Sequence, residues 1–240
     1  MYDYGDYCPI SKAAQILGER WTLLIVRELL SGSTRFNEIR RYLPKLSPTL
    51  LNARLRMLEE QGLVIRRKRP ELRSFEYRLT PSGRELLPIV LSIGRWGARW
   101  AYAGLNDQEI NTDVLMRDIR NSVDTSRLPA GRSVIQFQLV DQPTMNKWYL
   151  VADDGATEMC DEERSLDVDV YVTAARMTIA EIWTGKTAIP EALDDGRLKV
   201  TGLSSLVKTF THWFPRSPFH GARDDLDAAH PKAGPAVPGG

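Results

Sequence analysis

The chain has 240 residues, of which 42% are hydrophobic and 26% charged, and its formal net charge is +1. This length suffices for two domains. No apolar run approaches the ~18 residues of a membrane span and no signal pattern opens the chain, so we expect a cytoplasmic protein without a membrane partner. The balanced total conceals a division, because residues 1–105 carry 18 Lys and Arg against 10 Asp and Glu, whereas residues 106–240 carry 14 against 21. A basic half joined to an acidic half predicts an anion-binding domain beside a domain with another task.

Cysteine and histidine are too few and too scattered to predict a metal centre or a disulfide framework. Cys8 and Cys160 have no metal-ligand spacing, and His212, His220 and His230 are spread towards the C-terminus. No Ser/His/acid set and no pair of acids suited to general acid–base chemistry stands out. We therefore expect no bound metal, no cofactor and no enzymatic activity.

The first half of the chain begins with three segments of helical periodicity. Ser11–Leu17 can form one helix, broken at Gly18. Arg20–Leu30 is apolar nearly all round, which suits a helix buried in a small bundle. Arg35–Leu43 has apolar residues on one face and two arginines on the other. The three segments predict a compact helical bundle.

The next segment, Ser47–Arg69, has the signals of a helix followed by a strand. The hydroxyl of Ser47 can cap the helix, Pro48 suits the first helical position, and Gly62 is placed to end it. The apolar stripe that must face a core consists of Leu51, Leu55 and Leu58. The opposite face carries short or basic side chains, namely Thr49, Asn52, Ala53 and Arg56.

A basic two-stranded ribbon is predicted after this helix. Its first strand ends in Arg66–Arg69, a turn follows at Pro70-Glu71, and Ser74–Thr80 alternates apolar and polar residues. Two helices joined by a tight turn, the second with a polar outer face, form a helix-turn-helix, and the ribbon would be its wing. Such a helix fits the major groove of DNA, where side chains read base edges while basic groups hold phosphates.

We can therefore assign predicted DNA contacts. The residues predicted to contact base edges are Thr49, Asn52 and Arg56. Those predicted to contact phosphates are Arg35, Ser47, Arg54, Arg66, Arg67, Lys68 and Arg69. The alternative for each single arginine is an ordinary solvated charge. That alternative does not explain the charge, order and spacing of the whole segment.

A long helix, Ser82–Ala103, is expected to close this half, with more apolar surface than one small domain needs. A helix that is apolar on several faces must be covered, either by the following domain or by a second copy of the chain. We favour the second copy, because winged-helix regulators commonly read paired half-sites as two-fold dimers. The predicted partners are therefore the chain itself and a double-stranded DNA operator with an inverted repeat.

Several motifs of the first half are typical of one family. They are LGERWTLLI at 17–25, RFNEI at 35–39, EEQGLV at 59–64 and YRLTPSG at 77–83. With these motifs, residues 7–103 resemble the HxlR family of bacterial winged-helix regulators. The resemblance implies a DNA-binding homodimer, repressor or activator, with its first and last helices at the dimer interface.

Cys8 is the chemically interesting position in this resemblance, since some HxlR-like proteins use a cysteine there as a thiol switch for oxidants or electrophiles. Such sensing requires an accessible thiol with a lowered pKa. Asp3 and Asp6 would raise that pKa, although Lys12 and Arg20 could offset them. The alternative is a small packing residue at a helix start and subunit interface.

The second half of the chain alternates between strand and helix patterns. Strands are predicted at 134–140, 147–151, 156–160, 166–172 and 196–201, and helices at 113–121, 177–183, 189–193 and 203–214. The strict alternation in Leu166–Val172 indicates a strand with one buried and one exposed face, as in an antiparallel sheet covered on one side. Residues 104–112 form a polar connector before these elements.

This half resembles the sterol-carrier-protein-like domain, through TIxxIWxG at 178–185, ALxxGRLKVxG at 192–202 and the closing helix up to Phe214. The resemblance implies an apolar cavity that takes lipids or other hydrophobic molecules. The side chains predicted to line it are Phe137, Leu139, Trp148, Ile182, Trp183, Leu206, Phe210 and Trp213. The alternative for each of them is ordinary core, because a cavity lining has the composition of a core.

The predicted fold is therefore α+β, with two domains and a tail. Residues 1–105 form a winged helix-turn-helix DNA-binding and dimerisation domain with a long last helix. Residues 106–219 form a ligand-binding domain with a mainly antiparallel sheet covered by helices, and residues 220–240 form a disordered tail.

The predicted function is a DNA-binding transcriptional regulator, modulated by an apolar small-molecule effector in its second domain. One alternative places the signal at Cys8 as a redox or electrophile sensor. A second, of another class, is a lipid carrier whose basic half binds polyanions non-specifically. A third is catalysis on a bound lipid, which no residue set supports.

Overall fold

The computed structural model describes residues 3–5, 7–69, 74–101, 106–144, 146–161 and 166–222. The predicted turn at 70–71, the first two residues of the connector and the tail beyond 222 lie outside this part. The chain divides into two compact units, residues 1–94 and 95–240, so the division falls within the predicted helix Ser82–Ala103. Within the described part, no helix is long and apolar enough to cross a membrane.

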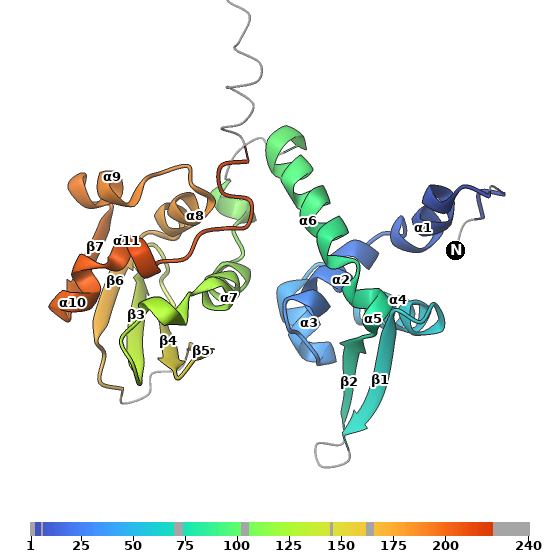
Figure 1. The fold of residues 1–240 in the computed structure, drawn as a ribbon, viewed down its shortest axis with the longest axis horizontal. Coiled ribbons are helices and arrows are strands. Elements are labelled where there is room, and N and C mark those ends of the chain that lie inside the picture. The colour runs from blue at the N-terminus through green and yellow to red at the C-terminus, as the bar shows by residue number, and fades with distance from the viewer. Residues whose placement is uncertain are drawn as a thin grey trace, which may run out of the picture. The chain divides into compact units, whose positions relative to one another are not determined.

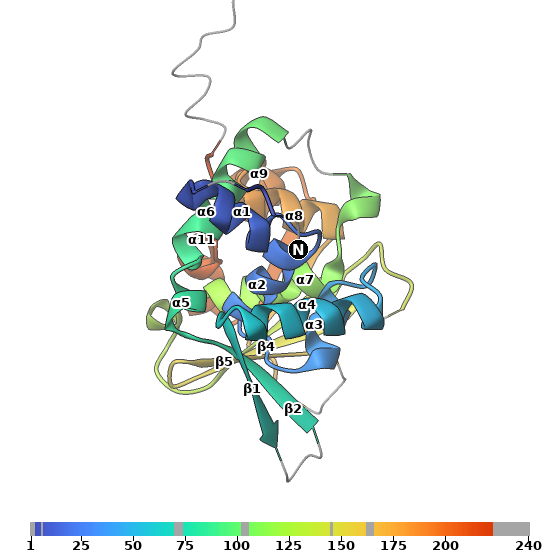
Figure 2. The ribbon, with the colours of Figure 1, turned by 90° about the vertical axis from the view of Figure 1, so that its right-hand side faces the viewer.

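The first unit consists of helices and one two-stranded ribbon (Figure 1). Its elements are α1 (Pro9–Leu17), α2 (Thr22–Leu30), α3 (Phe36–Tyr42), α4 (Pro48–Glu60), β1 (Val64–Arg69), β2 (Ser74–Leu79), α5 (Pro81–Arg84) and α6 (Leu87–Trp96). The ribbon strands are antiparallel, from Val64 opposite Leu79 to Arg69 opposite Ser74. Figure 2 shows the ribbon projecting beyond α3 and α4.

The long helix predicted over Ser82–Ala103 is divided in the structure. The short α5 is followed by α6, and a π-helical turn, Gly97–Ala101, continues it. Pro88 is the second residue of α6. Because proline lacks an N–H and clashes with the preceding turn, it is tolerated at a helix start but not in its interior. The chain therefore begins a new helix there.

The core of the first unit is built on α4. Leu51, Leu55 and Leu58 are buried, with exposed fractions of 0%, 1% and 0%, and they pack with residues of α2 and α3 in one cluster. Burying each leucine contributes roughly 1.5–3 kcal/mol. The Ser47 hydroxyl accepts a hydrogen bond from the Leu50 N–H at 3.3 Å, and Gly62 has φ +68° just after the helix. The predicted cap, stripe and helix end are confirmed.

The second unit is a five-stranded sheet with helices. Its regular elements are α7 (Thr112–Ser122), β3 (Ser133–Leu139), β4 (Lys147–Asp153), β5 (Ala156–Cys160), β6 (Val170–Ala174), α8 (Arg176–Thr184), α9 (Ile189–Asp194), β7 (Leu198–Gly202), α10 (Ser204–Lys208) and α11 (Phe210–Trp213). The strand order is β5-β4-β3-β6-β7. The β3–β6 pair is parallel and the other pairs are antiparallel, so the predicted mainly antiparallel sheet is confirmed.

One face of this sheet forms the core of the unit. Alternate residues of β3, namely Ile135, Phe137 and Leu139, share a buried cluster with residues of α7, α8, α9, α10 and α11. Phe210 lies against Trp213 and Phe214, with ring centroids 4.9 and 5.1 Å apart. The helices therefore cover the sheet on one side.

Two predicted elements of this half have other bounds in the structure. The strand expected at Leu166–Val172 is regular only over β6, because its pairing with β3 begins where Val170 lies opposite Ile135. The helix expected at 203–214 is interrupted at Thr209, which has φ −100° and ψ 10°. The Thr209 hydroxyl donates to the Ser205 carbonyl at 2.8 Å, a local bond of the kind that often bends helices.

Candidate nucleic-acid interface

The outer face of α4 is the first component of the candidate interface. Thr49, Asn52 and Arg56 are all exposed, and they lie opposite the buried leucine stripe. The 13-residue helix begins at Pro48 and is preceded by the buried Leu46, which anchors the turn from α3. The fold thus presents to solvent the three side chains predicted to read bases.

The start of α3 is held beside the ribbon by backbone bonds. The N–H groups of Thr34 and Arg35 donate to the Glu38 carboxylate at 2.8 and 2.9 Å. The Tyr77 N–H donates to the Thr34 carbonyl at 2.8 Å, and Arg35 pairs with Glu76 as a β-bridge. This arrangement fixes the exposed Arg35 next to the ribbon.

The ribbon divides its basic side chains between two faces. In the register, Arg66 lies opposite Tyr77 and Lys68 opposite Phe75. They alternate with Arg67, which lies opposite Glu76 on the other face. Arg66, Arg67 and Lys68 are exposed. The ribbon therefore offers cations on both sides.

Three of the arginines predicted to contact phosphates are engaged within the protein. One is Arg35, whose Nε atom lies 3.7 Å from a carboxylate oxygen of Glu38. The Arg54 guanidinium donates to a Glu19 carboxylate oxygen at 2.7 Å and to the Arg20 carbonyl at 3.0 Å, and only 19% of its side chain is exposed. Arg69 lies 3.0 Å from the carboxylate of Glu76. The position of Arg54 on α4 directs it to the loop before α2, so a contact with phosphate would require it to leave these bonds. Arg69 has part of its charge balanced locally.

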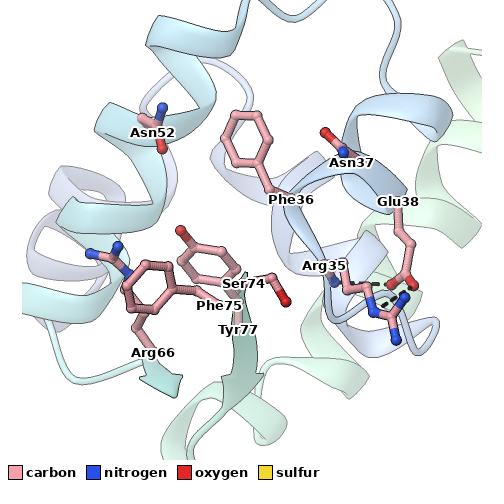
Figure 3. A pocket seen from close by; sticks show the side chains of 9 residues that line it. All are labelled: Arg35, Phe36, Asn37, Glu38, Asn52, Arg66, Ser74, Phe75 and Tyr77. Carbon is pink, nitrogen blue, oxygen red and sulfur yellow. Dashed lines mark hydrogen bonds and ion pairs between the residues drawn. The ribbon is translucent and has the colours of Figure 1, made fainter. Parts of the chain in front are cut away.

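A hollow of about 610 Å³ separates α3 and α4 from the ribbon (Figure 3). Its lining residues are Arg35, Phe36, Asn37, Glu38, Asn52, Arg66, Ser74, Phe75 and Tyr77. The Cζ atom of Arg66 lies 3.5 Å from the centroid of the Phe75 ring. The guanidinium of Arg66 thus lies over aromatic surface within the hollow. The Glu38 carboxylate in the same hollow is occupied by the N–H groups at the start of α3.

The aromatic residues of this hollow were not among the predicted site residues. Phe36 lies in the motif RFNEI, and Phe75 lies in the alternating segment Ser74–Thr80. One signal could have drawn attention to Phe75, namely an aromatic residue within a strand that pairs with a run of four basic residues. Only the register shows that its ring lies beside Arg66.

The helix α6 carries an exposed apolar surface. Leu87, Ile89 and Ile93 have exposed fractions of 45%, 46% and 47%, and Trp96 at the end of the helix has 61%. Near the N-terminus, Tyr7 and Ile10 are also exposed, with exposed fractions of 94% and 79%. Apolar surface of this kind marks an interaction site.

Cys8 lies directly before α1, at its N-cap position. The backbone N–H groups of Ser11 and Ile10 in the first turn of α1 lower the pKa of its thiol, and the Ser11 hydroxyl adds to this. An anion at a helix N-terminus is stabilised by such groups. The sequence had shown no clear source for a lowered pKa, and the helix start supplies one.

The eight side chains predicted to line a ligand cavity are all buried in the core cluster of the second unit. Their exposed fractions range from 0% at Phe137 to 7% at Trp183. A hollow of about 270 Å³ in this unit has a different lining, between residues 125–131 and the turn from β4 to β5. The eight predicted side chains are thus part of the core, and their role in ligand binding stays a prediction.

The exposed helix of a helix-turn-helix, followed by a basic ribbon, defines the first unit as a winged helix-turn-helix DNA-binding domain. Comparison with known proteins agrees. Residues 16–104 match the HxlR-like helix-turn-helix family, and residues 114–214 match the SCP-2 sterol transfer family. The HTH-type transcriptional regulator YvaP of Bacillus subtilis is 45% identical over 98 residues, which are 40% of this chain and 91% of YvaP.

Two further similar proteins come from the same species. The HTH-type transcriptional regulator YdeP is 34% identical over 102 residues, which are 41% of this chain and 80% of YdeP. A solved structure of the reduced regulator YodB is 32% identical over 42% of this chain and 100% of that one, with a TM-score of 0.37. The chain belongs to the HxlR-like family of helix-turn-helix transcriptional regulators, and its second half is an SCP-2-like domain. Both resemblances seen in the sequence are confirmed.

Proposed function

We propose that the protein regulates transcription as a homodimer that binds an inverted-repeat operator, a task that places it in the cytoplasm with the chromosome. The observation that carries this proposal is the geometry of α4, whose Thr49, Asn52 and Arg56 are exposed opposite a fully buried stripe. The α4 helix enters the major groove, and the ribbon holds the neighbouring backbone.

The homodimer is supported by the apolar surface of α6. Three aliphatic residues and Trp96 are about half exposed along one short helix. A second copy would cover this surface by two-fold symmetry and set two α4 helices about 34–36 Å apart, or a multiple of that, along the DNA. Sedimentation should then show a dimer at micromolar concentration. A species of only 27.2 kDa would contradict the homodimer.

The test of operator binding is selection from a random duplex library, followed by competition with bulk DNA. We expect an inverted repeat to emerge and to bind at least ~10³-fold more tightly than bulk DNA. Equal affinities would instead support a general polyanion binder. Under that outcome the lipid-carrier alternative would replace the regulator.

A thiol switch at Cys8 is the second candidate, favoured by the lowered pKa of that thiol. Oxidants react with thiolates, so this cysteine would respond before an ordinary one. Operator affinity should then change on treatment with diamide in the native protein and in Cys160→Ser, but not in Cys8→Ser. An equal response of all three proteins would contradict the switch.

For the SCP-2-like unit we infer a binding role without catalysis, with a hydrophobic small molecule as the effector. The support is the family match, since sterol transfer requires an apolar site. A ligand can alter operator affinity only by its differential affinity for two states of the protein. Titration with fatty acyl and aromatic ligands should therefore shift operator affinity. Ligand binding that leaves operator affinity unchanged would contradict the coupling.

A further inference from the structure

The ribbon of the first unit contains an aromatic side chain that the core does not need. Phe75 is 38% exposed, and it lies at the rim of the hollow between the ribbon and the helices. Its partner in the register is Lys68, and the Arg66 guanidinium lies over its ring at 3.5 Å (Figure 3). A single exposed phenylalanine is ordinary at a protein surface, so it is the contact of this ring with a guanidinium that carries the inference.

We propose that Phe75 is a positioning residue, whose ring holds Arg66 at the mouth of the hollow so that the guanidinium meets a phosphate of the DNA backbone. This inference rests on the proposed DNA binding. A free arginine side chain loses rotamer freedom when it binds a phosphate, and a guanidinium stacked on an aromatic face has lost part of it beforehand. The stack leaves the guanidinium edge, which carries the N–H donors, available to an anion.

The surroundings of Arg66 favour a phosphate at this place. The hollow is bounded by α4, which carries Asn52, and by the start of α3, which carries Arg35. DNA that places a base edge against Asn52 and touches the ribbon must pass its backbone between them. The Glu38 carboxylate there accepts the N–H groups of Thr34 and Arg35 and lies 3.7 Å from the Arg35 Nε atom. The Glu38 carboxylate and the Arg35 guanidinium therefore offset each other, and Arg66 is the guanidinium of this hollow that is held by a ring instead.

The basic residues of the ribbon therefore have different roles. Arg66 is held by a ring, whereas Arg69 is held by the Glu76 carboxylate at 3.0 Å. An aromatic face leaves the full positive charge in place, but a carboxylate offsets it. The geometry makes Arg66 the better placed of the two for a phosphate.

A double-mutant cycle tests this inference. Binding of one duplex is measured against salt for the native protein, Phe75→Leu, Arg66→Ala and the double variant. Phe75→Leu should weaken binding about two- to five-fold. Arg66→Ala should reduce the slope of log K against log salt by ~0.9. In the Arg66→Ala background, Phe75→Leu should change neither quantity.

Two further variants serve as controls. Phe75→Tyr keeps an aromatic face and should retain native affinity, and Phe75→Leu should still weaken binding in an Arg67→Ala background, because Arg67 lies on the other face. If Phe75→Leu reduced the affinity for the duplex equally with and without Arg66, or did not reduce it at all, the inference would be overturned while DNA binding remained intact. A native protein that binds no duplex would overturn both.

Discussion

The two units of this protein place their distinctive side chains in opposite environments. In the first unit, α4 exposes Asn52 and Arg56 to solvent, and the ribbon exposes a row of cations. In the second unit, Phe210 and Trp213 are 2% and 1% exposed. Folding does not require particular side chains on the solvent-exposed face of a helix. The specific polar and basic residues on the exposed face of α4 therefore point to a binding partner. Folding does require buried aromatic residues, so their burial alone does not distinguish a core from a binding cavity.

The largest expected effect tests the second half of this contrast. Phe210→Ala should lower the free energy of unfolding of the SCP-2-like unit by about 3–5 kcal/mol, because Phe210 packs against two aromatic rings in a close-packed core. Urea unfolding followed by tryptophan fluorescence measures it. The matched control is Tyr171→Ala, a 41% exposed aromatic on β6, which should cost much less. A cost below about 1 kcal/mol at Phe210 would indicate a loosely filled site that can accept a ligand.

The next effect concerns the exposed face of α4. Asn52→Ala should remove roughly 1–3 kcal/mol of discrimination at one base position, because a paired amide contact to a base edge is lost. Stability should be unchanged, since Asn52 is exposed. The measurement is operator selection with the variant, compared with the native preference. An unaltered preference would mean that the recognition face has been placed wrongly.

A smaller effect separates two arginines of the first unit. Arg67→Ala should weaken binding to all sequences alike and reduce the salt slope by ~0.9, because one phosphate contact is lost. Arg54→Ala should leave the slope unchanged but lower stability by about 1 kcal/mol, through loss of its bonds to Glu19 and the Arg20 carbonyl. Equal slopes for both variants would contradict the division between surface and structural arginines.

The smallest effect concerns Cys8, measured in a Cys160→Ser background. Its pKa is lower in the folded chain than in the unfolded one, so the alkylation rate with iodoacetamide should rise at lower pH in the native protein than in urea. By linkage, the thiolate contributes stability above the unfolded pKa, and this contribution is lost as pH falls through the folded pKa. Identical pH profiles in both states would show that the start of α1 does not affect the thiol.

The sequence indicated the elements of the fold well where the signal was local. The cap at Ser47, the leucine stripe and the end at Gly62 depend on residues within one helix, and all are confirmed. The break before α6 is also local, because Pro88 was visible, but the apolar pattern over Ser82–Ala103 outweighed it in the prediction. The first residue of β6 is set by the point at which pairing with β3 begins. The sequence of one strand alone does not reveal that point.

By itself, the sequence determined the α+β class, the helix-turn-helix with its wing, the division into a basic and an acidic half, and which face of α4 is polar. Periodicity and capping are properties of neighbouring residues, so they can be read without the fold. The tertiary structure alone decided that Arg54 meets Glu19, that Arg69 meets Glu76, and that Arg66 lies over Phe75 in a hollow lined by α3, α4 and both ribbon strands. Ion pairs, ring contacts and empty volume depend on strand register and on how segments pack against one another, and the pattern within one segment reveals neither.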